Sequence, residues 1–149
     1  MTAKNTIIKG LKNNQDYYFA VTAINDLNIE SVYSDEVKLK VVDVIVPEKP
    51  VNFKAEIDVS DSKNQKIISN WKQVDDTVYS LFYGPNPNPA VSVMVGKKAS
   101  YTISKLSNLL IQDYYLQLVS EDMSGNKSEP VVLKCAKGCS LKHCECQVF

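Results

Sequence analysis

The chain has 149 residues, and its 17 basic side chains, all of them lysine, are balanced by 17 acidic ones. A neutral chain without arginine lacks both the electric field and the side chain that favour nucleic-acid binding, so we expect no nucleic-acid partner. No run approaches the roughly 18 apolar residues of a membrane span, and residues 1–6 lack the apolar core of a signal peptide. We therefore expect neither a membrane span nor a signal peptide in this sequence.

Residues 1–44 are predicted to form three β-strands. Residues 6–8 are a short apolar stretch, whereas residues 17–25 and 37–41 place large apolar side chains at alternate positions. Alternation with a period of two puts one face of a strand against a core and the other against water. Asparagine and aspartate between these segments favour turns.

Residues 45–50 are predicted to link two modules. They contain Pro47 and Pro50, and proline stiffens a connector because it cannot donate to a strand ladder. Beyond this linker, residues 114–122 repeat the alternation of residues 17–25, an offset of 97 residues from 17 to 114. A repeat of about 100 residues has the size of a β-sandwich module.

Residues 51–134 are predicted to form a complete antiparallel sandwich. Seven segments have strand character: 51–57, 66–71, 79–83, 91–95, 101–103, 114–122 and 131–133. Residues 84–89 contain three prolines, which predicts a loop at one end of the sandwich. Exposed loops in that position commonly bind partners, so this loop is our candidate contact surface. Its candidate contact residues are Pro85, Asn86, Pro87 and Asn88.

Residues 135–149 form a cysteine-rich tail. It holds all the cysteines of the chain, Cys135, Cys139, Cys144 and Cys146, together with the only histidine, His143. Three states are open: two disulfides, a zinc site drawn from these five residues, or a reduced and disordered tail. The cysteines lack the paired C-x2-C spacing of common zinc sites. Cys144 and Cys146 are too close to bridge each other easily, so each is expected to pair with Cys135 or Cys139.

No group of residues predicts an active site or a cofactor site. Acidic pairs occur at residues 75–76 and 121–122, but neighbours in a strand point to opposite faces and neighbours in a loop are usually solvated. A catalytic triad would need His143, which lies in the tail. Alternation places Trp71 and the tyrosines in the core rather than on a sugar-stacking platform. We therefore expect no enzyme.

Several motifs resemble fibronectin type III domains. Leu11 lies six residues before Tyr17, at the start of a Tyr-x-Phe-x-Val strand, which is similar to the tyrosine corner of that family. Trp71 ends a predicted strand, as the strand-B tryptophan of the family does, and residues 122–128 resemble its F–G turn. The resemblance implies an all-β, immunoglobulin-like (fibronectin type III) antiparallel β-sandwich, in which Tyr17 and Trp71 are structural residues.

The resemblance also assigns strands to the two modules. Residues 1–44 match strands E, F and G alone, which makes them a partial second sandwich of a tandem repeat. The complete module matches strands A, B, C, C′, E, F and G, with Tyr114 as a structural residue at the second corner. Ser69 stands where the family has an aliphatic residue, so a one-residue bulge is expected there. Leu106 precedes Tyr114 by eight residues rather than six, so residues 109–111 either cap the sandwich end or supply the corner partner.

The function implied by the resemblance is a non-enzymatic structural or adhesion module that binds a protein or a glycan. Its setting would be extracellular, or the surface of a cell or virion, where disulfides are favoured over zinc. One alternative is an assembly subunit, whose open residues 1–44 are completed by strand exchange with a neighbouring chain. Another is a metal-binding accessory domain of a larger enzyme, with zinc in the tail.

Overall fold

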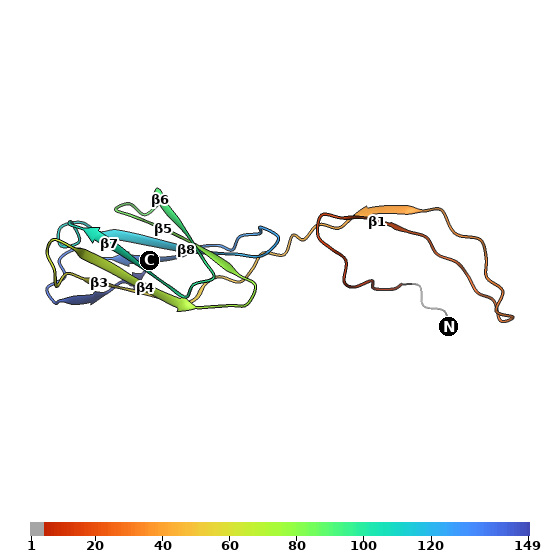
Figure 1. The fold of residues 1–149 in the computed structure, drawn as a ribbon, viewed down its shortest axis with the longest axis horizontal. Helices are drawn as coiled ribbons and strands as arrows, with labels where there is room; N and C mark the ends of the chain where they lie inside the picture. Colours follow the sequence, from red (N-terminus) through yellow and green to blue (C-terminus); the bar gives the residue numbers. More distant parts are fainter. Residues whose placement is uncertain (1–4) are drawn as a thin grey trace. The chain divides into compact units, whose positions relative to one another are not determined.

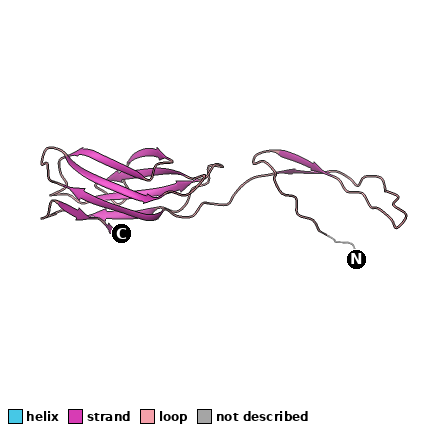
Figure 2. Ribbon diagram, turned by 60° about the horizontal axis from the view of Figure 1, so that its bottom comes forward, coloured by secondary structure: helices cyan, strands magenta, loops and turns pink. Residues whose placement is uncertain are grey.

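The computed structural model describes residues 5–149, which are all-β (Figure 2). The chain divides into two compact units, Met1–Val44 and Ile45–Phe149. The strands of both units pair antiparallel, which confirms the predicted fold class. Within residues 5–149 the structure has no helix long and apolar enough to cross a membrane.

The first unit is a two-stranded hairpin with strands β1 (Asp16–Phe19) and β2 (Val37–Lys40) (Figure 1). Tyr17 lies opposite Leu39, and Phe19 lies opposite Val37, so these four side chains share one face. The predicted strand at residues 6–8 is wrong, because that segment has no strand in the structure. A strand needs a neighbour for its backbone hydrogen bonds, and residues 5–44 contain no second sheet for strand E to join.

The second unit is a sandwich of two sheets (Figures 1 and 2). Its strands are β3 (Val51–Asp58), β4 (Gln65–Lys72), β5 (Val78–Gly84), β6 (Val91–Gly96), β7 (Ser100–Leu106), β8 (Tyr114–Glu121), β9 (Val131–Cys135), β10 (His143–Glu145) and β11 (Gln147–Val148). One sheet has the order β10-β3-β4-β7 and the other the order β11-β9-β8-β5-β6. Apart from β10 and β11, this is an A-B-E sheet facing a G-F-C-C′ sheet, as in a fibronectin type III fold.

The core lies between these two sheets, with Trp71 among other aromatic side chains. The ring centroid of Trp71 is 6.1 Å from that of Phe53 and 5.6 Å from that of Tyr79. The Tyr79 hydroxyl donates to the Lys72 carbonyl oxygen at 3.2 Å and accepts a hydrogen bond from the Val74 N–H. Trp71 is therefore a core residue, and its ring does not form an exposed platform.

Ser69 faces this core without a bulge. Buried positions alternate along β4, where Ile67, Ser69 and Trp71 all point inward. Ser69 stays in regular register with Ala55 on one side and Tyr101 on the other. Its hydroxyl donates to the Tyr101 carbonyl oxygen at 2.8 Å. The bulge predicted at this position is wrong, because this hydrogen bond lets a polar side chain occupy a buried site.

Candidate functional site

The tail runs along one edge of the sandwich and joins both sheets. β10 pairs with β3, and β11 pairs with β9, so the chain passes from one sheet to the other between them. Cys146 lies at this crossing, where its N–H donates to the Ala55 carbonyl oxygen at 2.8 Å. Two further backbone hydrogen bonds, each 3.0 Å, hold the ends: Val59 N–H to Lys142 O and Phe149 N–H to Val132 O. The tail is an ordered part of the second unit rather than an appendage to it.

Two disulfides fix this path. Cys135–Cys146 joins the end of β9 to the crossing, and both of its cysteines are buried. Cys139–Cys144 closes the outer loop of the tail, and both of its cysteines are half-buried. With every described cysteine in a disulfide, the tail offers no thiolate to a zinc ion. Across residues 5–149, no three His, Cys, Asp or Glu side chains gather as metal ligands.

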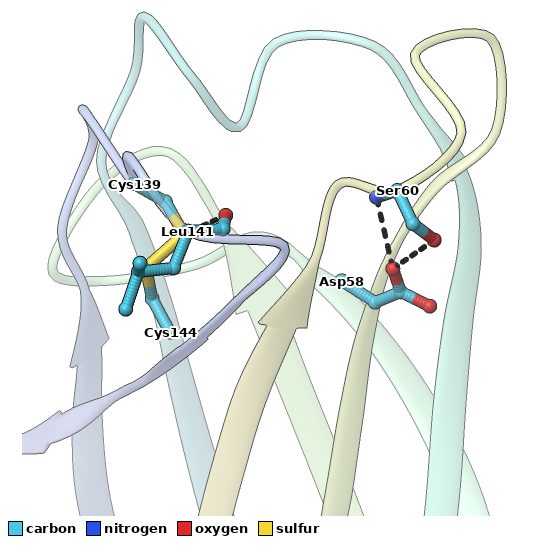
Figure 3. Close-up of a disulfide and its surroundings, with 5 residues drawn as sticks. All are labelled: Asp58, Ser60, Cys139, Leu141 and Cys144. Atoms are coloured by element: carbon cyan, nitrogen blue, oxygen red, sulfur yellow. Dashed lines mark hydrogen bonds between the residues drawn. A yellow bond between two sulfur atoms is a disulfide. The ribbon is translucent and has the colours of Figure 1, made fainter.

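The outer loop lies beside the end of β3 (Figure 3). Cys139 Sγ is 3.1 Å from the Leu141 carbonyl oxygen. Nearby, Asp58 Oδ1 accepts hydrogen bonds from the Ser60 hydroxyl at 2.6 Å and the Ser60 N–H at 3.0 Å. These bonds, chiefly the one from the hydroxyl, hold the pKa of Asp58 below its ordinary value. His143 lies opposite Asp58 in the ladder, so the only histidine faces a carboxylate that is already hydrogen-bonded.

Asp113 anchors the start of the tail, a role that the sequence did not indicate. Its carboxylate accepts the Lys137 N–H at 2.9 Å and forms a 2.9 Å ion pair with Lys134. The Lys137 bond first, and then the Lys134 ammonium, hold the pKa of Asp113 below its ordinary value. Just before it, Leu109 is fully buried, and its N–H donates to Gln65 Oε1 at 2.8 Å. Of residues 109–111, Leu109 packs into the core, whereas Leu110 and Ile111 are exposed.

The turns that follow β1 and β8 have the same hydrogen bonds. Asn25 Oδ1 accepts the N–H groups two and four residues later, both at 3.0 Å. Asp122 Oδ1 does the same at 2.8 and 2.9 Å. Beyond each turn, Ser31 Oγ and Ser128 Oγ accept the N–H of the residue eight positions earlier, at 2.9 and 3.1 Å. The hairpin of the first unit therefore has the local structure of the F–G hairpin in the sandwich.

The two predicted corner tyrosines differ in their surroundings. The Tyr17 hydroxyl accepts the Lys12 N–H at 2.8 Å, five residues upstream, which closes a tyrosine corner in the first unit. Tyr114 is half-buried and packs against the core of the second unit. Opposite it in the ladder is Cys135 of the buried disulfide, where Tyr17 has Leu39.

The equivalent faces of the two hairpins differ sharply in exposure. Val21 is 69% exposed, whereas Leu118, 97 residues later, is completely buried. Val37 is 63% exposed, whereas Leu133, which holds the same place in its ladder, is 1% exposed. In the second unit the facing sheet covers these positions. Residues 5–44 therefore expose positions whose counterparts in the β8–β9 hairpin are buried.

The candidate contact loop lies between β5 and β6. Pro85, Asn86, Pro87 and Asn88 are all exposed. Gln117 Nε2, on the neighbouring strand β8, donates to the Pro87 carbonyl oxygen at 2.8 Å. This bond ties the middle of the loop to the sheet, so its prolines and asparagines project from a fixed base.

The chain matches no protein-family model and no curated protein. Among solved structures it is similar to the extracellular region of rat CD45, domains d3–d4, with 10% sequence identity and a TM-score of 0.49. The match covers 89% of this chain and 68% of the CD45 chain.

Proposed function

We propose that the chain is a non-enzymatic structural or adhesion module of the fibronectin type III family, in an extracellular or surface-exposed protein. The observation that carries this proposal is the pair of disulfides that lock the tail across both sheets. Disulfides persist in oxidising compartments and are rare in the cytosol. A tail whose path depends on two of them suits a protein that works outside the cell.

The partner of such a module is a protein or a glycan, and the loop Pro85–Asn88 is the surface that we propose for it. Its exposed prolines restrict the backbone, so less conformational entropy is lost when a partner binds. Replacing Asn86 and Asn88 with alanine should weaken binding to a candidate ligand array and leave the thermal unfolding temperature unchanged. Unchanged binding by this variant would move the contact surface elsewhere.

The oxidation state is tested by mass spectrometry of the unreduced chain. We expect a mass lower than that of the reduced chain by four hydrogens, with proteolytic fragments that link Cys135 to Cys146 and Cys139 to Cys144. Protein made in an oxidising compartment should have this mass without added oxidant. Free thiols in all of that material, with the sandwich still folded, would contradict the proposal.

A second candidate function is an assembly subunit, favoured by the exposed inner face of the β1–β2 hairpin. In this function, strands from a neighbouring chain would cover Val21 and Val37. One form of this assembly would be an exchange in which a β1–β2 hairpin takes the place of β8–β9 in the neighbour's sandwich. The Cys135–Cys146 disulfide opposes that exchange, because it holds the end of β9 in place. Hydrogen exchange tests this function, because amides of residues 16–40 should be protected in the oligomer alone. Equal protection in the monomer would exclude it.

A further inference from the structure

The two disulfides of the tail differ in their access to solvent. Cys135 is 1% exposed and Cys146 is 9% exposed, and both belong to the hydrophobic core. Cys139 and Cys144 are half-buried in the outer loop, beside the end of β3 (Figure 3). Reduction of a disulfide begins when a thiolate reaches one of its sulfur atoms. Access therefore favours attack on the outer bond.

The two sites also differ in how well they would hold a pair of thiols. When a disulfide is reduced, its two sulfur atoms must separate to van der Waals contact. In a densely packed core, that separation would strain the neighbours of Cys135 and Cys146. In the outer loop, Cys139 Sγ already lies 3.1 Å from the Leu141 carbonyl oxygen. A thiol at Cys139 can donate its hydrogen to this oxygen, whereas a disulfide sulfur has no hydrogen to donate. The reduced outer pair therefore gains a hydrogen bond that the oxidised pair lacks.

The tail has fixed points on both sides of the outer bond. Before it, the Gly138 N–H donates at 3.0 Å to a carbonyl oxygen of the turn that precedes β8. After it, Cys146 is held by the buried disulfide. Residues 139–145 lie between these points. Their backbone ties to the sandwich are the three-residue ladder of β10 with β3 and the 3.0 Å hydrogen bond from the Val59 N–H to the Lys142 carbonyl oxygen.

So short a strand depends on the loop that leads into it. The Cys139–Cys144 bond closes a loop with a sequence separation of 5, which restricts the conformations open to the chain before β10. Cleavage of the bond returns that freedom to the loop, and β10 can then pair with β3 only by giving it up again. A ladder of three residues offsets little conformational entropy. Cleavage should therefore loosen β10, while the two fixed points hold the rest of the tail.

We propose that the Cys139–Cys144 bond is a reducible switch: a dithiol cleaves it while Cys135–Cys146 stays intact, and its cleavage releases β10 from the edge of β3. A thiolate of the dithiol attacks one sulfur atom, forms a mixed disulfide and expels the other cysteine as a thiolate. The second thiol of the reductant then displaces the remaining cysteine, and the reductant leaves as an intramolecular disulfide. The two cysteines gain two electrons and two protons, which the dithiol loses. The switch rests on the disulfide-bonded tail of the proposed function, but not on the identity of its partner.

Selectivity is tested on the full oxidised chain, equilibrated at about pH 7 with mixtures of reduced and oxidised dithiothreitol. Alkylation traps the free thiols, and peptide mass spectrometry reports the state of each cysteine. We expect the outer pair to be half-reduced at a ratio of reduced to oxidised dithiothreitol at least about tenfold lower than the buried pair. The fluorescence of the buried Trp71 should remain native at that ratio. Reduction of both pairs at the same ratio, earlier reduction of the buried pair, or unfolding together with the outer bond would overturn the proposal.

Release of β10 is tested by hydrogen exchange at the ratio that reduces the outer bond alone. The Val59 amide, whose acceptor is the Lys142 carbonyl oxygen, should exchange at least about tenfold faster than in the oxidised chain. The Cys146 amide, which is held at the crossing, should keep its rate. An unchanged rate at Val59 would overturn the switch, and so would an equal acceleration at Cys146, since the whole tail would then have come away.

Two variants of the outer loop show whether the bond itself is responsible. Cys139→Ala/Cys144→Ala should have the fast Val59 exchange without any reductant. Ser140→Ala/Lys142→Ala is the matched control, because it changes two exposed side chains of the same loop and leaves the bond intact. This control should keep the slow exchange of the oxidised wild type. Slow exchange in the first variant, or fast exchange in the control, would mean that the bond does not hold β10 in place.

Failure of the switch and failure of the proposed function give different results. Starting material without the loss of four hydrogens would contradict the proposed function. Oxidised material in which both disulfides are reduced together would contradict the switch alone.

Discussion

Removal of the buried disulfide should cost more stability than removal of the outer one. The first closes a loop with a sequence separation of 11 and the second a loop with a separation of 5. Loop-closure entropy alone assigns about 3 kcal/mol to the first and about 2 kcal/mol to the second. Loss of the two buried sulfur atoms adds about 1 kcal/mol to the first, because Cys135 and Cys146 lie in the core.

The comparison uses Cys135→Ala/Cys146→Ala and, as its matched control, Cys139→Ala/Cys144→Ala. Urea unfolding is followed by the fluorescence of Trp71, the only tryptophan, which reports the second unit alone. We expect losses of about 4 and about 2 kcal/mol in the free energy of unfolding. Hydrogen exchange should show the Val59 amide deprotected in the first variant, because β10 loses its anchor.

Two results would refute this reasoning about the crossing. One is a larger loss of stability in the outer variant than in the buried one. The other is an unchanged exchange rate for the Val59 and Cys146 amides when the Cys135–Cys146 bond is absent. Either would mean that backbone pairing alone holds the tail on the sandwich.

Three further predictions compare matched positions. Leu118→Ala should lower the free energy of unfolding of the second unit by about 2–5 kcal/mol. Val21→Ala should change the free energy of opening of the first hairpin, measured by amide exchange, by less than about 0.5 kcal/mol. Similar losses at both sites would mean that the first hairpin is also covered. Ser69→Ala should cost about 1 kcal/mol in urea unfolding because the buried bond to the Tyr101 carbonyl is lost, and a gain in stability would contradict this. The hydrogen bonds from Asn126 hold the pKa of Asp122 below its ordinary value, so its contribution to stability is present above about pH 4 and is lost as the pH falls through the folded-state pKa. Asp122→Asn should reduce the fall in unfolding free energy below about pH 4, since Asn25 makes the same turn without a charge. An unchanged fall would mean that other carboxylates cause it.

Much of the sandwich could be predicted from the sequence because its strands have one wet and one dry face. Alternation predicted the inward-facing residues of β3, β5 and β8, and the structure buries most of them. Val51 is exposed, however, and Tyr83 and Tyr114 are only half-buried. The position of Tyr17 after Leu11 predicted a corner, and the hydroxyl does accept a backbone N–H upstream. These features depend on residues close together in the sequence, which is why a single sequence reveals them.

The features that the sequence did not reveal depend on distant partners. Residues 143–148 pair with β3 and β9, which would otherwise be the edge strands of the predicted sandwich. Nothing in the composition of residues 143–148 indicates that they join these edges. Ser69 reads as a departure from the family because its partner, the Tyr101 carbonyl, lies 32 residues away. Residues 6–8 have the composition of a strand but no neighbour to pair with. In each case a tertiary contact, or its absence, overrides the local preference.

The crossing at Cys146 also decides how the second unit would carry a mechanical load. A pull on the C-terminus first reaches β11 and then the Cys135–Cys146 bond, which transmits tension directly to the end of β9. The ten residues between these cysteines, 136–145, are bypassed by the force. While the bond is intact these residues cannot extend, so the chain under tension is shorter by roughly 35 Å, at 3.5 Å per residue, than it would be without the bond. β10, which lies within this bypassed segment, can therefore stay on the edge of β3 while the C-terminus is under tension.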